Sequence, residues 1–346
     1  GIFGMYVNND PGNPERYLVH MYQGGIGLPD KDYYTDEKYE DIRTEYVPHI
    51  SRMLMLAGWS ATDAIDAAQA IYELEAKIAQ HHWSRVESRE AEKTYNLKDL
   101  AGLKNLNKKI LWDEYLAGAE LKSSLLDWNV VMMPSFFEGI EELLSDDHLE
   151  TWKLWLSWVL VRSYAPYLSS GFVEERFAFY GTKLTGQPVN RPRWKRAVGL
   201  VEGSLGEAVG QIYVEKHFPA SSKKKMEELV GHLIEAYRQS ITNLDWMTEE
   251  TKVKALEKLS KFTPKIGYPD KWKDYSAIEI SRADLVGNVR RVSSWEFDYH
   301  ANKIGAPIDR DEWHMTPQTV NAYYNPGLNE IVFPAAILQP PFFSLS

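Results

Sequence analysis

Nine histidines are the candidate nitrogen ligands for a catalytic metal in this chain, which contains no cysteine. They lie at positions 20, 49, 81, 82, 148, 217, 232, 300 and 314. No two are three or four residues apart, the separation that lets a helix present two imidazoles on one face in a His-Glu-x-x-His motif. His81 and His82 would point about 100° apart on a helix, which makes them a poor chelating pair. The sequence therefore lacks the familiar helical zinc motif.

Most of these histidines are interpreted as packing, capping or surface hydrogen-bonding residues. His300 and His314 lie among acidic residues, so a scattered histidine and carboxylate metal site remains the alternative for them. The absence of cysteine also excludes a thiol nucleophile and a disulfide framework. Gly203-Ser204-Leu205-Gly206 has the wrong spacing for the Gly-x-Ser-x-Gly turn of serine hydrolases, and neither a P-loop nor a dinucleotide fingerprint is present.

A short stretch near the end of the chain, Val320 to Tyr324, has residue types suited to holding an extended peptide. In a strand, a small residue between an amide and an aromatic side chain can offer both backbone and side-chain hydrogen bonds. Docking at the edge of a sheet reads the main chain of the ligand rather than its sequence. The alternative for this segment is an ordinary half-buried strand.

Helical periodicity dominates the first 280 residues. The helices that it predicts would have to position any peptide-binding site. Ser60 followed by Asp63 predicts the start of one helix, and Thr248 predicts the N-cap of another. An apolar stripe predicts a long helix before the second cap: Met226, Leu229, Val230, Leu233, Ile234, Tyr237, Ile241 and Leu244. Other predicted helices cover residues 46–57, 110–121, 137–144, 149–164 and 194–214.

The character of the sequence changes after about residue 280. Asn325-Pro326-Gly327 supplies turn residues between two runs rich in Val, Tyr, Ile and Phe, which predicts two strands joined by a short loop. We therefore predict a fold that is mainly α with a small β part. A domain boundary is placed near residue 280, which separates residues 1–280 from residues 281–346.

Composition and charge exclude several classes of partner. The formal net charge of -10 opposes non-specific attraction to nucleic acid or to anionic lipid. The most apolar stretch, Leu154 to Val161, is eight residues long, whereas a membrane-spanning helix needs about 20. It is interpreted as part of a buried helix, and no nucleic-acid partner or membrane span is predicted for this chain.

The segment Asn321 to Phe343, NAYYNPGLNEIVFPAAILQPPFF, resembles the stretch before the zinc-binding helix in the neprilysin and endothelin-converting-enzyme family of zinc metalloendopeptidases. The segments GLPDKDYY at 27–34, FYGTKLTG at 179–186, YVEKHFP at 213–219 and LDWMTEETKVKALEKLSKFTPKIGYPDKW at 244–272 support the likeness. The resemblance covers nearly the whole chain and is greatest to actinobacterial secreted members. It implies a large all-α lid domain over residues 1–280, followed by the start of a thermolysin-like α/β catalytic domain over residues 281–346.

The resemblance also implies which residues contact a peptide substrate. Asn321 and Ala322 would hold the substrate backbone, with Tyr323 alongside. Ile337 and Phe342 would line the apolar pocket for the residue after the scissile bond, which implies cleavage on the amino side of apolar residues. The alternative for Ile337 and Phe342 is ordinary core packing beside a Pro-Pro turn.

The family's His-Glu-x-x-His helix and its later glutamate ligand have no counterpart in this sequence, which also lacks an initiating Met and a signal peptide. The resemblance thus implies a piece of a zinc endopeptidase with catalytic residues and zinc ligands outside this chain. Its partners would be peptide substrates and the C-terminal segment of the same protein, and the chain alone is predicted to be inactive. A non-catalytic peptide-binding module and a structural helical scaffold are the rival hypotheses. A secreted or cell-associated location is favoured, with a cytoplasmic one as the alternative.

Overall fold

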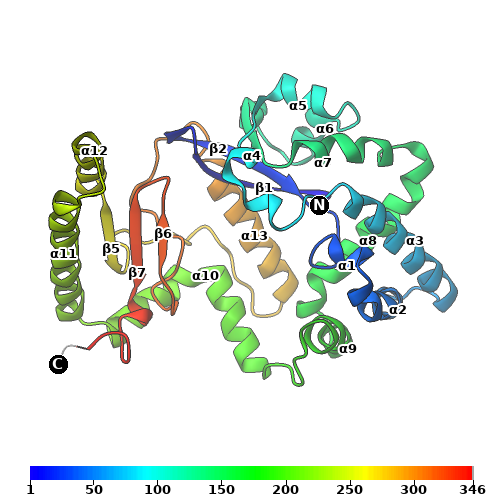
Figure 1. Ribbon diagram of the computed structural model, residues 1–346. Coiled ribbons are helices and arrows are strands. Elements are labelled where there is room, and N and C mark those ends of the chain that lie inside the picture. Colours follow the sequence, from blue (N-terminus) through cyan, green and yellow to red (C-terminus); the bar gives the residue numbers. More distant parts are fainter. Residues whose placement is uncertain (345–346) are drawn as a thin grey trace. The chain divides into compact units, whose positions relative to one another are not determined.

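The computed structural model describes residues 1–344 and divides the chain into two compact units that alternate along the sequence (Figure 1). The first unit contains Gly1–Arg191 and Ile280–Pro307, and the second contains Pro192–Glu279 and the chain from Ile308 onward. The prediction of a mainly α fold with a small β part is confirmed. The division into a lid over residues 1–280 and a catalytic part after it stays a prediction.

The first unit is built mainly from helices that bury aromatic and aliphatic side chains against one another. They are α1 (Asp32–Thr35), α2 (Glu40–Leu56), α3 (Ala61–Gln80), α4 (Ala91–Thr94), α5 (Leu100–Leu106), α6 (Trp112–Gly118), α7 (Pro134–Gly139), α8 (Leu149–Tyr164), α9 (Ser170–Arg176) and α13 (Leu285–Ala301). A π-helical segment, η7 (Phe177–Lys183), continues α9. The helices α2, α3 and α8 pack together, and Tyr46, Ile71 and Trp158 lie fully buried among them.

Local signals explain where several of these helices begin and end. The Ser60 hydroxyl accepts the Asp63 N–H at 3.2 Å and donates to the Asp63 carboxylate at 2.7 Å, so the predicted cap is confirmed. The predicted helix over 149–164 is confirmed with the same bounds. The helix predicted from residue 46 begins earlier, at Glu40, and the one predicted over 137–144 is α7 followed by a 3-10 turn, Ile140–Leu143.

A four-stranded sheet in the first unit was not predicted. Its strands are β1 (Phe3–Asp10), β2 (Asn13–Gln23), β3 (Leu97–Asp99) and β4 (Trp128–Val131), in the order β1-β2-β4-β3. The strands β1 and β2 form an antiparallel hairpin closed at Pro11 and Gly12, where the Gly12 N–H donates to the Asp10 carboxylate at 2.8 Å. The pairing of β2 with β4 is parallel and joins segments more than a hundred residues apart.

The apolar stretch predicted to belong to a buried helix is helical, inside α8, but only partly buried. Trp155 and Trp158 are buried, whereas Leu156 and Leu160 are exposed. Across the part of the chain that the structure describes, no helix combines the length and the apolar character needed to cross a membrane.

The second unit holds three long helices and a three-stranded sheet (Figure 1). The helices are α10 (Arg193–His217), which is kinked at Leu205, α11 (Ala220–Asn243) and α12 (Glu249–Ser260). The strands are β5 (Thr263–Gly267), β6 (Tyr323–Asn325) and β7 (Glu330–Pro334), in the order β5-β7-β6, and the 3-10 turn η8 (Ala335–Ile337) follows. The core shared by helices and sheet contains Phe218, Met226, Val230, Ile266, Ala335 and Leu338.

The apolar stripe of α11 is only partly buried in this unit. Met226 and Val230 lie in the core, while Leu229, Leu233 and Tyr237 are 44%, 51% and 64% exposed. The predicted N-cap of α12 is confirmed, because the Thr248 hydroxyl accepts the Thr251 N–H at 3.3 Å. The predicted strand pair is also confirmed: β6 and β7 are antiparallel and are joined by a turn in which the Gly327 N–H donates to the Asn325 side chain.

Candidate functional site

The strand predicted to dock a peptide lies at the edge of the second unit's sheet. In the order β5-β7-β6, one side of β6 pairs with β7, with Tyr323 opposite Val332 and Asn325 opposite Glu330. Asn321 and Ala322 come directly before β6 in the chain. An edge strand presents a row of backbone N–H and C=O groups on its outer side, which an extended chain can pair with.

Tyr323 is fixed by its surroundings rather than free to reach a ligand. Its side chain is half-buried, and its hydroxyl accepts the His314 backbone N–H at 3.0 Å. Burial, together with the nearby Glu330 and Glu312 carboxylates, raises the pKa of Tyr323 to about 12, although the hydrogen bond from His314 opposes the rise. The hydroxyl therefore stays protonated at neutral pH, and the ring anchors the strand.

Asn321 is exposed immediately beside this anchor. Its side-chain oxygen accepts the Ala322 N–H at 2.8 Å, and its own backbone N–H donates to the Thr319 carbonyl at 3.0 Å. Both bonds are local, so the side-chain amide group of Asn321 is held by its own segment alone. An approaching peptide could therefore exchange one local bond for a bond of its own without disturbing the sheet.

Ile337 and Phe342 occupy different environments. Ile337 belongs to η8, is partly buried and packs against the core of the second unit. Phe342 follows the Pro340-Pro341 pair and is 71% exposed. The structure brings together Asn321, Ala322 and Tyr323 through the chain itself, whereas Ile337 and Phe342 lie in the segment that follows β7.

The histidines and carboxylates in the described part of the chain are not arranged to fit a catalytic zinc site. Among residues 1–344 the structure contains no group of three or more histidine, aspartate or glutamate side chains placed to hold one metal ion. His300 and His314, the candidates for a scattered site, contact Tyr299 and Tyr323 with their rings.

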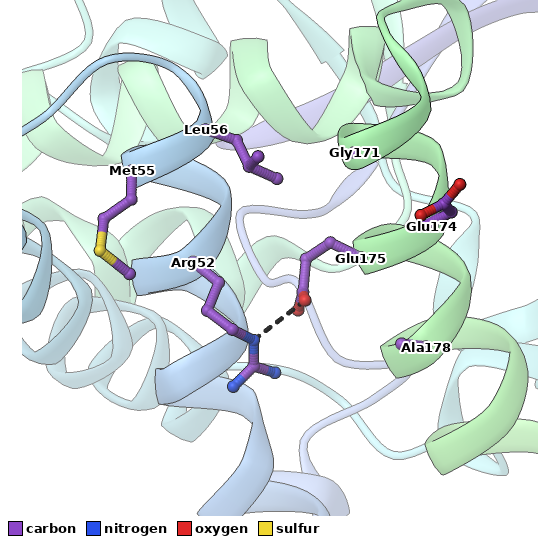
Figure 2. Close-up of a pocket in the computed structure, with 7 residues that line it drawn as sticks. All are labelled: Arg52, Met55, Leu56, Gly171, Glu174, Glu175 and Ala178. Atoms are coloured by element: carbon purple, nitrogen blue, oxygen red, sulfur yellow. Dashed lines mark ion pairs between the residues drawn. The ribbon is translucent and has the colours of Figure 1, made fainter.

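A cavity of about 560 Å³ lies in the first unit between the C-terminal turns of α2 and helix α9 (Figure 2). Arg52, Met55 and Leu56 of α2 face Glu175 and its neighbours on α9 across it. The Arg52 Nε lies 2.9 Å from a Glu175 carboxylate oxygen. This ion pair ties the two helices together at the cavity wall, whose lining includes both apolar and charged side chains.

Behind this cavity, His49 of α2 is fully buried against Phe179, and its Nδ1–H donates to the second Glu175 carboxylate oxygen at 2.8 Å. Its Nε2 atom has no hydrogen-bond partner among the described residues. Burial lowers the pKa of His49 below 6.5, which outweighs the opposing effect of Glu175, and Arg52 and Arg176 lower it further. Burial acts to raise the pKa of Glu175, but the hydrogen bonds from His49 and Arg52 hold it below its ordinary value.

The stability of the first unit should consequently fall in mild acid. Because the pKa of folded His49 lies below its ordinary value of 6.5, the unfolded chain takes up the proton first, and stability is lost as the pH falls through 6.5. We therefore expect the His49→Asn variant to lose less stability than the wild type between pH 7.5 and 5 in urea unfolding. The asparagine side chain keeps a hydrogen-bond donor near the Nδ1 position of His49 but does not titrate. Parallel pH profiles for the two proteins would contradict this expectation.

The sequence does not single out Glu75, Lys265 or Glu330, and it presents His49 only as one of nine histidines. The side chains are buried or, for Lys265, largely buried, and each pairs with a residue distant in sequence, such as Lys265 with Glu330 and His49 with Glu175. A buried charged residue inside an apolar strand, as in Glu330-Ile331-Val332-Phe333, is the one local signal that could have pointed to such a partner.

Comparison with known proteins gives the family. The profile described as Peptidase family M13 matches residues 1–269, and a second profile of the same family matches residues 321–346. Neprilysin-3 of Drosophila melanogaster is 29% identical over the whole chain, and endothelin-converting enzyme 1 of Mus musculus is 32% identical. The chain spans about half the length of these curated relatives, 46% of each.

Solved structures agree with this assignment. The crystal structure of the Mycobacterium tuberculosis zinc metalloprotease Zmp1 in complex with an inhibitor matches all of this chain and 52% of its own, with 47% identity and a TM-score of 0.94. The PepO structure from Lactobacillus rhamnosis matches all of this chain with a TM-score of 0.91 at 24% identity, which bears on the fold alone. By sequence profile and by structure, this chain belongs to peptidase family M13.

Proposed function

We propose that this chain is part of a zinc-dependent endopeptidase that hydrolyses peptide bonds in oligopeptides on the amino side of apolar residues. The observation that carries the proposal is the match to peptidase family M13 over residues 1–269 and 321–346. The likeness to the Mycobacterium tuberculosis zinc metalloprotease, at 47% identity, supports zinc as the metal of the complete protein. The chain spans about half of its relatives, so the proposal concerns the complete protein.

In this proposal the zinc and its ligands belong to the remainder of the protein. Bound zinc would polarise the scissile carbonyl and lower the pKa of its water. The contribution of residues 1–346 is to select and hold the substrate. Residues 1–280 would act as a lid that admits peptides and rejects folded proteins, and residues 281–346 would begin the catalytic domain.

The peptide would bind as an additional strand along the outer side of β6. Asn321 and Ala322 supply hydrogen bonds to its main chain, and Tyr323 keeps the strand in place through its bond to the His314 N–H. Main-chain pairing of this kind accepts many sequences, which suits a peptidase with a broad range of peptides. Selectivity for an apolar residue would come from Ile337 and from Phe342, whose exposed ring is available to a ligand.

Residues 1–346 purified alone should bind no catalytic zinc and cleave no peptide, because none of the nine histidines are spaced to form the helical motif. The complete protein should hold one zinc per molecule and lose peptidase activity to a chelator. Metal analysis and a fluorogenic peptide assay on both proteins test this. Chelator-sensitive cleavage by residues 1–346 alone would overturn it, and peptide binding without cleavage by the complete protein would instead favour a non-catalytic binding module.

A further inference from the structure

A largely buried lysine lies in the same row of the sheet as Tyr323 of the proposed docking strand. Lys265 of β5 pairs in register with Val332 of β7, which pairs with Tyr323 of β6. Residues that are neighbours across a sheet project to the same face, and Glu330, two positions from Val332, shares this face as well. Lys265, Glu330 and Tyr323 therefore belong to a single side of the sheet.

Lys265 makes two charge-assisted contacts there. Its Nζ lies 2.6 Å from a Glu330 carboxylate oxygen, and it donates to the backbone carbonyl of Glu312 at 2.9 Å. The two side chains of the ion pair are 9% and 2% exposed. The other Glu330 oxygen has no hydrogen-bond partner within residues 1–344. Lys265 is therefore the main group that offsets the free-energy cost of burying this carboxylate.

The hydrogen bond from Lys265 to the Glu312 carbonyl connects the lysine to Tyr323 through residues 312–314. Glu312 is followed by the buried Trp313 and then by His314, whose N–H donates to the Tyr323 hydroxyl at 3.0 Å. Residues 312–314 are thus held at one end by Lys265 and hold β6 at the other. Because β6 is paired with β7 over only three residues, Tyr323 to Asn325, this second attachment adds substantially to how firmly the strand is placed.

We propose that Lys265 is a positioning residue for the docking strand: it fixes segment 312–314, which in turn fixes Tyr323 and the adjoining Asn321 and Ala322. The inference rests on the proposed function of β6. Buried ion pairs contribute little net stability compared with apolar residues of similar size, whereas they can specify one arrangement of neighbouring segments. The geometry here offers such a role, since Lys265 contacts β7 and segment 312–314 at once.

The test compares the complete wild-type protein with the double variant Lys265→Met/Glu330→Met. This variant leaves no unpaired buried charge but removes the bond to the Glu312 carbonyl. Lys252→Met is the matched control, because Lys252 is also a mostly buried lysine of this unit, 14% exposed, but pairs with Glu249 on α12. We expect the double variant to raise KM for peptides by about three- to tenfold, with kcat nearly unchanged. This fold-change corresponds to the free energy of one lost hydrogen bond.

Hydrogen exchange supplies a readout that does not depend on activity. In the double variant, exchange over residues 312–325 should accelerate, while exchange in α11 and the melting temperature stay close to the wild type. Wild-type KM and wild-type exchange in this variant would overturn the inference, as would equal effects of Lys252→Met. If the wild-type complete protein cleaves no peptide, the proposed function fails, and exchange over 312–325 still decides whether Lys265 positions the strand.

Discussion

Replacing Gly27 with alanine is expected to destabilise the first unit by about 3 kcal/mol, through both overpacking and broken hydrogen bonds in a buried polar cluster. A Cβ atom at this position would overlap the Tyr46 hydroxyl and would lie 2.5 Å from the Arg162 guanidinium. The Gly27 N–H donates to the Tyr34 hydroxyl at 3.1 Å and to the Glu75 carboxylate at 3.0 Å. Any shift that makes room for the methyl group must therefore disturb these bonds.

The cluster is costly to disturb because its centre is a fully buried carboxylate. Glu75 accepts hydrogen bonds from the Tyr34 hydroxyl at 2.7 Å and the Tyr46 hydroxyl at 2.9 Å. Burial raises the pKa of Glu75, while Arg162 and the hydrogen bonds act against the rise. The cluster also explains the segment GLPDKDYY at 27–34, since Gly27 and Leu28 both donate their N–H groups to Tyr34 at its far end.

Urea unfolding of Gly27→Ala, followed by a probe of the first unit, tests this expectation. Gly118→Ala is the matched control, because Gly118 ends α6 in the same unit and nothing lies within 4 Å of the Cβ it would gain. The control should keep wild-type stability to within about 0.5 kcal/mol. A Gly27→Ala protein as stable as Gly118→Ala would mean that the cluster rearranges freely around the methyl group.

Asn321→Ala in the complete protein is expected to lower kcat/KM for peptides by roughly ten- to fiftyfold, because a side-chain partner of the substrate backbone is lost. A hydrogen bond contributes about 0.5 to 1.5 kcal/mol, and a substrate group left buried without a partner adds to that loss. Asn321 is exposed and bonds only within its own segment, so its removal should leave the sheet and the zinc content intact.

Peptidase kinetics and metal analysis on the same preparation separate these effects. Asn243→Ala is a suitable control, since Asn243 is an exposed asparagine of the same unit whose side chain bonds only to the preceding turn of α11. It should show wild-type kinetics. Wild-type kinetics in Asn321→Ala as well would show that this segment does not dock the substrate, and a parallel loss of zinc would indicate a structural defect instead.

The sequence by itself determined those parts of the molecule that depend on neighbouring residues. The caps at Ser60 and Thr248 were predicted because their hydroxyls bond N–H groups three residues away. The β6–β7 pair was predicted because its turn and its two apolar runs lie within a dozen residues. The resemblance to a known family, not the local pattern alone, implied the roles of Asn321, Ala322 and Tyr323, which stay a prediction; the structure places them before and within an edge strand.

Only the tertiary structure decided the features that join distant segments. The four-stranded sheet pairs β2 with β4 in parallel, and nothing in the short β3 or β4 sequences specifies that partner. The Tyr46–Glu75 hydrogen bond and the Lys265–Glu330 ion pair likewise bring together residues that are 29 and 65 positions apart. A local pattern indicates that a residue prefers to be buried, but which group compensates a buried charge depends on how the whole chain packs around it.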